Sequence, residues 1–171
     1  MKLIRDTEIS KVYEDGNTFI KIMSRPYSFL DWDWYHNYCA FQSEYLICPK
    51  IHHFVPKREI HMEKVDGQEM KHFILKANAA CKGIHKRTYI DCFKIIQEIK
   101  YFMADYSQKN GIFCMHTDIS VENILMKSAH SYQLVDIDSF RFNWGLHMYQ
   151  YNTAEGWLMT ELLAHKVGKQ W

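Results

Sequence analysis

At 171 residues the chain is long enough for one domain, or for one domain divided into two lobes, and too short for a tandem array. Lysine and arginine number 21 against 20 aspartates and glutamates, a formal net charge of +1 at pH 7, so the strong basic excess typical of nucleic-acid binding is missing. Hydrophobic residues make up 47% of the chain and aromatic residues 15%, which excludes a disordered or collagen-like protein and predicts a substantial core.

The first third of the chain predicts strands. Four β-rich runs are expected, paired as two hairpins: residues 9–15, 17–23, 50–55 and 58–65. The first hairpin turns at Asp15-Gly16, a strong turn signal, and the second ends at Asp66-Gly67. Between the hairpins, aromatic residues at helical spacing predict a helix over about 30–46, which stops before Pro49.

After Gly67 the pattern becomes helical. The clearest helix covers about 89–109, with one apolar face: Phe93, Ile96, Ile99, Met103 and Tyr106. Thr88 and Asp91 resemble a capping box at its start, and Asn110-Gly111 supplies its end. Short apolar runs follow, and the last 30 or so residues are expected to be helical and irregular, with a plausible apolar face: Trp157, Leu158, Leu162 and Leu163.

Polar residues interrupt these short apolar runs in a pattern that suggests phosphoryl transfer. The segment HTDISVEN places Asp118 five residues before Asn123, and Asp136 follows the next strand-like pair. A carboxylate so placed can orient an attacking hydroxyl, while an amide and a second carboxylate supply oxygen ligands for Mg²⁺, which prefers few carboxylates together with substrate phosphates. Phosphoryl transfer depends mainly on such positioning and charge neutralisation.

These residues resemble the catalytic and metal-binding loops of the protein-kinase-like superfamily: H-x-D-x-x-x-x-N, an apolar strand, then two apolar residues and Asp, preceded by a long helix that ends at Asn-Gly. Ordinary Ser/Thr kinases carry Lys two residues after the catalytic Asp, whereas this sequence has Ser120. The sequence is therefore closer to the atypical branches: RIO-type kinases, aminoglycoside phosphotransferases and lipopolysaccharide core kinases. The resemblance covers about 130 residues.

The resemblance implies a role for each matching residue. Asp118 matches the catalytic base, Asn123 the second metal ligand and Asp136 the principal Mg²⁺ ligand, with Asp138 ranked behind Asp136. Lys21, in the second β-run, matches the lysine that pairs with the nucleotide phosphates. Met62, Glu63 and Val65 resemble the hinge, where backbone groups near residues 63 to 65 meet the adenine of ATP. His116 is expected to be a structural residue that hydrogen-bonds the loop.

Two features depart from the family pattern. The stretch matched to the glycine-rich loop, Ile9 to Gly16, contains a single glycine. The acidic partner of Lys21 is also missing from its usual position, since a helix glutamate usually follows the lysine by about 16 to 20 residues and none stands there. Glu44 is the nearest candidate, and Asp31 and Asp33 are the others.

The resemblance predicts an α+β protein with a bilobal protein-kinase-like fold. Residues 1–66 would form a small antiparallel-sheet N-lobe of about five strands and one helix, and residues 67–171 a short, mainly helical C-lobe that carries the catalytic and metal-binding loops. Because only 35 residues follow Asp136, the expectation is a minimal kinase with a truncated C-lobe, as in some secreted effectors and viral kinases.

The function expected is ATP-dependent phosphoryl transfer, with Mg²⁺ or alternatively Mn²⁺, to Ser or Thr hydroxyls of a partner protein. A small-molecule or glycolipid kinase and a catalytically weak pseudokinase acting as a binding module are the alternatives. Five cysteines in no regular pattern and a charged N-terminus, MKLIRDTEISK, favour a cytoplasmic protein, or one delivered into a host cytosol if it is an effector. The longest stretch without Asp, Glu, Lys or Arg has 13 residues, so no transmembrane segment is expected.

Overall fold

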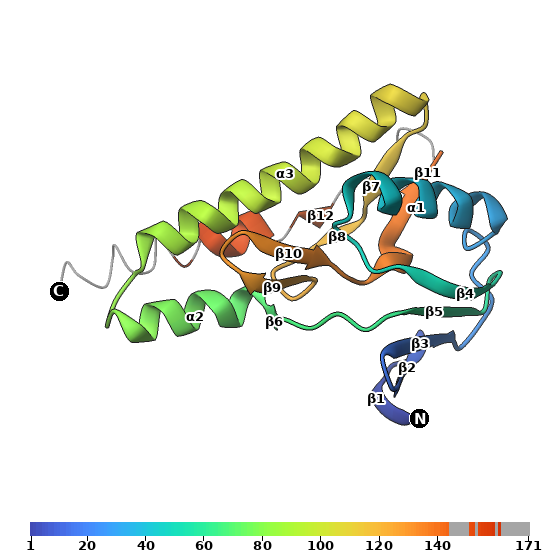
Figure 1. The fold of residues 1–171 in the computed structure, drawn as a ribbon, viewed down its shortest axis with the longest axis horizontal. Helices are drawn as coiled ribbons and strands as arrows, with labels where there is room; N and C mark the ends of the chain where they lie inside the picture. The colour runs from blue at the N-terminus through green and yellow to red at the C-terminus, as the bar shows by residue number, and fades with distance from the viewer. Residues whose placement is uncertain (144–150, 153, 160, 162–171) are drawn as a thin grey trace.

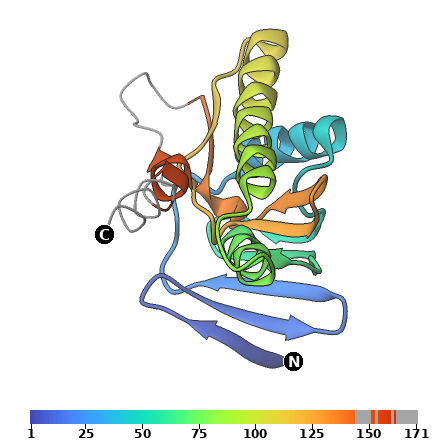
Figure 2. The same cartoon turned by 90° about the vertical axis from the view of Figure 1, so that its left-hand side faces the viewer.

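The computed structural model describes residues 1–143, 151–152, 154–159 and 161. It confirms the α+β class: an antiparallel sheet of five strands stands beside helices and three smaller sheets. In Figures 1 and 2 the strands β1 to β3 lie on the side of the molecule opposite the long helix α3. Within the described residues, no helix is both long and apolar enough to span a membrane.

The five-stranded sheet has the order β1-β2-β3-β5-β4, with every neighbouring pair antiparallel. Its strands are β1 (Lys2–Asp6), β2 (Ser10–Asp15), β3 (Thr18–Met23), β4 (Ile51–Val55) and β5 (Glu59–Glu63). Both predicted hairpins are confirmed, and Gly16 takes the left-handed φ of 59° that its turn requires. β1 was not predicted, because all five of its side chains are exposed and its sequence has no alternation of polar and apolar residues.

Helix α1 (Trp32–Tyr45) lies in sequence between β3 and β4, as predicted. Asp31 begins it by accepting a hydrogen bond from the Trp34 N–H at 2.9 Å, and Leu46 ends it in the left-handed conformation. Its buried face contacts the core through aromatic rings. The Trp34 indole N–H donates to the Phe140 carbonyl at 3.0 Å, and the Tyr38 hydroxyl donates to the Pro49 carbonyl at 2.7 Å. These bonds join α1 to the chain at Phe140 and to the chain at Pro49, just before β4.

Two further helices follow: α2 (Met70–Ala80) and α3 (Lys86–Asn110). The predicted end of α3 is confirmed, since Gly111 adopts a left-handed φ of 63° there. The predicted capping box is wrong, because the helix begins earlier, after His85, and Thr88 lies inside its first turn. The Thr88 hydroxyl bonds the His85 ring at 2.7 Å, and Asp91 accepts from the Arg87 side chain at 3.1 Å.

The remaining strands form three small sheets, which hold the predicted catalytic and metal-binding loops. β6 (Gln68–Glu69) and β10 (Ser131–Leu134) flank β9 (Ile124–Ser128), β11 (Phe140–Phe142) pairs with β7 (Cys114–His116), and β12 (Tyr151–Asn152) runs parallel to β8 (Asp118–Ile119). One 3₁₀ turn, η1 (Ile137–Ser139), separates β10 from β11. Residues 154–159 are helical with Leu158 buried, whereas Leu162 and Leu163 of the predicted apolar face lie outside the described residues.

The core contains side chains from all three long helices, α1, α2 and α3, and from the strands β3 to β5 and β7 to β11. The strands β1 to β5 come entirely from residues 2–63, whereas the short strand β6 pairs with β9. The division into lobes at residue 66 stays a prediction.

Candidate functional site

A cleft of about 580 Å³ lies beside the inner strands of the five-stranded sheet. One wall consists of apolar and polar side chains of β1 to β3 and of the loop that joins β1 to β2. The other wall comes from the segments around residues 118–125 and 135–141. The charged and polar residues predicted for catalysis and metal binding are among its lining: Lys21, Asp118, Asn123 and Asp136.

Lys21 enters the cleft from the middle of the sheet. It lies in β3, between Val12 of β2 and Ile60 of β5, and its side chain is only 11% exposed. A buried ammonium requires partners, because its desolvation is otherwise very costly. Lys21 Nζ donates to Asp136 Oδ1 at 2.8 Å and to Asp138 Oδ1 at 2.5 Å. Two carboxylates therefore share one cation.

A short, unusual stretch of backbone presents both carboxylates. Asp136 has left-handed angles (φ 60°, ψ 49°), and η1 follows it at once. Ser139 closes this turn: its N–H donates to the Asp136 carbonyl at 2.8 Å and its hydroxyl to Asp136 Oδ2 at 2.7 Å. Ile137, between the two acids, is fully buried in the core. Asp136 and Asp138 both line the cleft.

Charge and burial oppose each other at this cluster. Burial acts to lower the pKa of Lys21, but the charges of Asp138 and Asp136 outweigh burial and raise it. Burial acts to raise the pKa of Asp136, yet the charge and hydrogen bond of Lys21 hold that pKa well below its usual range. Asp136 is therefore ionised at neutral pH, as a metal ligand must be.

Asp118 and Asn123 contact each other directly. Asn123 Nδ2 donates to the Asp118 carbonyl at 3.1 Å and to Asp118 Oδ2 at 2.9 Å, so the amide orients the carboxylate. The Val135 N–H donates to the Asn123 carbonyl at 2.8 Å, which ties this loop to the segment that carries Asp136. Burial, and then the charge of Asp136, raise the pKa of Asp118. A carboxylate with a raised pKa accepts a proton more readily.

His116 hydrogen-bonds the loop of Asp118 and the segment that carries Asp136, as the sequence predicted. It is fully buried, and its Nε2 lies 3.2 Å from the carbonyls of Val135 and Asp136. The Asp118 N–H donates to Nδ1 at 3.3 Å. Burial lowers the pKa of His116 to about 4, so the ring is neutral at pH 7. With Nε2 as donor and Nδ1 as acceptor, one neutral tautomer satisfies both loops.

Glu44 does not lie at the site. The sequence favoured it as the acidic partner of Lys21, but its carboxylate accepts from Lys109 Nζ at 2.9 Å, at the exposed end of α1. The acids at the other end of the helix do not reach Lys21 either, since Asp31 caps α1 and Asp33 is exposed in its first turn. Asp138 stands beside Lys21 instead. The one signal in the sequence is that Asp138 lies two positions after the predicted metal ligand Asp136.

The predicted hinge residues Met62, Glu63 and Val65 all line the cleft. Two N–H groups of this segment are already used: that of Glu63 donates to the Lys50 carbonyl at 2.8 Å, and that of Lys64 to the Asn17 carbonyl at 2.9 Å. These two N–H groups are therefore not free to donate to an adenine ring. Apolar side chains that an adenine ring could pack against line the cleft: Ile9, Val12, Phe19 and Leu125.

The loop that borders the cleft differs from the one the sequence suggested. The stretch from Ile9 to Gly16 was matched to the glycine-rich loop, but Gly16 lies at the far end of β2, in the turn to β3. The loop at the cleft is the turn from β1 to β2 around Thr7, which has no glycine. Thr7 Oγ1 accepts from the N–H groups of Ile9 at 3.3 Å and Ser10 at 3.0 Å. These amides are therefore occupied, and phosphates would depend on side chains and a metal.

The predicted metal ligands suit a hard cation of the Mg²⁺ type. Asn123 uses its Nδ2 for Asp118, which leaves Oδ1 for a metal, and Asp136 supplies an ionised carboxylate in the same cleft. In the part of the chain that the structure describes, no group of three or more His, Cys, Asp or Glu is arranged to hold a metal ion. Two protein oxygens fit Mg²⁺, which usually keeps several waters and takes its remaining ligands from substrate phosphates.

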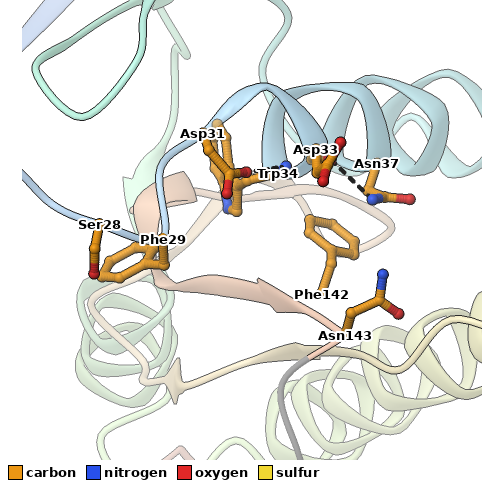
Figure 3. Close-up of a pocket in the computed structure, with 8 residues that line it drawn as sticks. All are labelled: Ser28, Phe29, Asp31, Asp33, Trp34, Asn37, Phe142 and Asn143. Carbon is orange, nitrogen blue, oxygen red and sulfur yellow. Dashed lines mark hydrogen bonds between the residues drawn. The ribbon is translucent and has the colours of Figure 1, made fainter.

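A second, smaller cavity of about 250 Å³ lies beside the N-terminal half of α1 (Figure 3). Asp31, Asp33, Trp34 and Asn37 of the α1 region face it from one side, and Phe142 with Asn143 from the other. Its polar groups are largely used locally, since Asp31 accepts the Trp34 N–H and Asn37 Nδ2 donates to the Asp33 carbonyl at 2.8 Å. The predicted catalytic residues lie in the larger cleft.

Comparisons with known proteins add no relative. No family model matches this chain, and no curated protein matches it significantly.

Proposed function

We propose that this protein is an ATP- and Mg²⁺-dependent phosphotransferase that acts on a hydroxyl group. One observation carries the proposal. Lys21 of β3 lines one cleft with Asp118, Asn123 and Asp136, which come from the C-terminal half of the chain. Each matches a residue that the sequence resemblance links to phosphoryl transfer, and nothing in the local sequence requires Lys21 to meet the other three.

Each residue has a task that its contacts support. Lys21 would bind the nucleotide phosphates, and Asn123 with Asp136 would hold the metal. Asp118, oriented by Asn123, would accept a hydrogen bond from the acceptor hydroxyl and direct its oxygen at the phosphorus. The metal, when bound, would neutralise charge on the transferred group. The bilobal kinase-like fold and a cytoplasmic location, where ATP is abundant and thiols stay reduced, belong to the same proposal.

The acceptor we propose is a Ser or Thr of a partner protein. A pseudokinase is the second candidate, and the β1–β2 loop favours it. The N–H groups of Ile9 and Ser10 already bond Thr7, so backbone support for the γ-phosphate is weak. A cleft of this kind can hold a nucleotide without turning it over.

Thermal melting with nucleotide tests binding first. A ligand at 100 times its Kd stabilises the native state by about 2.7 kcal/mol. For 171 residues this corresponds to a rise in Tm of about 7 °C with MgATP. No shift with millimolar MgATP or MnATP contradicts the proposal, and an equal shift without metal removes the metal roles of Asn123 and Asp136.

Mass spectrometry after incubation with MgATP and a cell lysate then tests transfer, with Asp118→Asn as the matched control. Phosphoprotein formed by the wild type and not by the variant supports protein phosphorylation. Turnover on a sugar, an aminoglycoside or choline, with no phosphoprotein, supports a small-molecule kinase. Binding without either product supports the pseudokinase.

A further inference from the structure

The acidic residues of α1 do not serve Lys21. Asp33 is exposed in the first turn, and Glu44 in the last turn bonds Lys109. Between these ends, the helix turns large side chains such as Trp34 and Tyr38 into the core. A lysine that is 11% exposed must therefore find its counter-charge on another element.

The two carboxylates that Lys21 contacts are not equivalent. The Asp136 side chain is 29% exposed, and it also accepts a hydrogen bond from Ser139. The Asp138 side chain is 11% exposed, and its bond to Lys21, at 2.5 Å, is the shorter of the two. Mg²⁺ dehydrates reluctantly and keeps several waters, so it can reach the more exposed carboxylate with less cost. This difference favours Asp136 as the metal ligand and leaves Asp138 with Lys21.

The backbone of its own turn holds Asp138 in place. It lies in η1, whose Ile137 is fully buried and whose Ser139 is bonded to Asp136. The Arg141 side chain adds a further constraint, because its Nη1 donates to the Asp138 carbonyl at 2.6 Å. The turn that carries the predicted metal ligand therefore also fixes Asp138.

We propose that Asp138 is the positioning residue of Lys21: its carboxylate holds the ammonium towards the nucleotide phosphates while Asp136 is engaged with the metal. This inference rests on the proposed function and deepens it. Lys21 and the metal ligand are then anchored by one turn, Asp136 to Ser139. Lys21 therefore has its counter-charge without an acid on α1.

Binding and turnover of MgATP by the full chain test the assignment. Asp138→Asn keeps the shape of the side chain and removes its charge. We expect it to weaken MgATP binding, measured by titration calorimetry, and to lower kcat/KM, each by about 10- to 100-fold, as for loss of one charge-assisted hydrogen bond. Glu44→Gln and Asp33→Asn, the matched controls, should stay within about twofold of the wild type.

A double-mutant cycle separates positioning from packing. If Asp138 acts through Lys21, adding Asp138→Asn to Lys21→Met should change the Kd for MgATP by less than about twofold. A full additional loss would mean that Asp138 acts by packing alone and would overturn the inference. If Asp138→Asn does not fold, Asp138→Glu retains the charge, and its affinity should exceed that of Lys21→Met; equal affinity overturns the inference.

The outcomes also separate this inference from the proposed function. A wild-type protein that binds no MgATP overturns both. A wild-type protein that binds MgATP, together with an Asp138→Asn variant of unchanged affinity, overturns the positioning role alone. Loss of affinity in Glu44→Gln would return that role to α1.

Discussion

Replacing Lys21 with methionine tests how the cleft balances its charge. Methionine keeps much of the side-chain length but removes the ammonium that bonds Asp136 at 2.8 Å and Asp138 at 2.5 Å. Removing one partner of a buried ion pair costs about 3–5 kcal/mol, because the remaining charge is uncompensated. Since Asp136 is 29% exposed and faces an open cleft, we expect the lower limit, about 3 kcal/mol.

This cost converts into a measurable shift of the melting temperature. An unfolding entropy of 2.1 cal/mol/K per residue amounts to about 0.36 kcal/mol/K for 171 residues. Lys21→Met should therefore melt about 8 °C below the wild type at pH 7, measured by circular dichroism without nucleotide or metal. Lys11→Met is the control, because Lys11 and its partner Asp6 are both about half exposed; a loss below about 1 kcal/mol is expected.

The pKa of Asp136 sets how the Tm difference between Lys21→Met and the wild type depends on pH. Lys21 lowers its pKa in the folded state, so this carboxyl contributes stability at neutral pH that is lost as the pH falls through the folded pKa. Lys21→Met lacks that contribution. In this variant, protonation at lower pH relieves the repulsion between Asp136 and Asp138. The difference in Tm should be full at pH 7 and smaller near pH 4. A Lys21→Met protein that melts within 2 °C of the wild type at pH 7 would refute the buried cluster.

Three further predictions concern the catalytic loop and the core. Asp118→Asn should lower turnover by about 100-fold or more with little change in MgATP affinity, whereas Asp136→Asn should weaken the affinity; the reverse pattern would exchange their roles. Because burial and Asp136 raise the pKa of Asp118, the acid limb of kcat/KM should titrate above the usual aspartate value of about 3.9, and a limb at or below it argues against Asp118 as base. Tyr38→Phe leaves the buried Pro49 carbonyl without its hydroxyl donor and should cost about 1–3 kcal/mol, or about 3–8 °C in Tm; an unchanged Tm would show that water replaces the bond.

Local patterns were sufficient for much of the fold. Asp15-Gly16 marks the first hairpin because few residues accept the backbone angles of a tight turn, and Gly16 has a positive φ. Helical periodicity predicted α1 and most of α3. The start of α3 was misplaced because Thr88 has the residue type of a cap, and its bonding to His85 depends on where the helix begins. β1 gave no signal, since it is held by pairing with β2 and not by burial.

The candidate site divides in the same way. Motif spacing was enough to nominate Asp118, Asn123 and Asp136, because the distance along one loop limits what its side chains can reach together. Motif spacing could not identify the acidic partner of Lys21. Lys21 and Asp138 are 117 residues apart, and only the packing of η1 against β3 brings them to 2.5 Å.

The sequence by itself determined the residue types, the turns and the short-range spacing, which depend on neighbours within a few positions. Tertiary structure decided which of several acids meets Lys21, that Glu44 bonds Lys109 at the surface, and that the loop around Thr7 borders the cleft in place of Gly16. These outcomes depend on long-range contacts. A buried charge takes the partner that the fold brings closest, because desolvation makes every unpaired arrangement too costly.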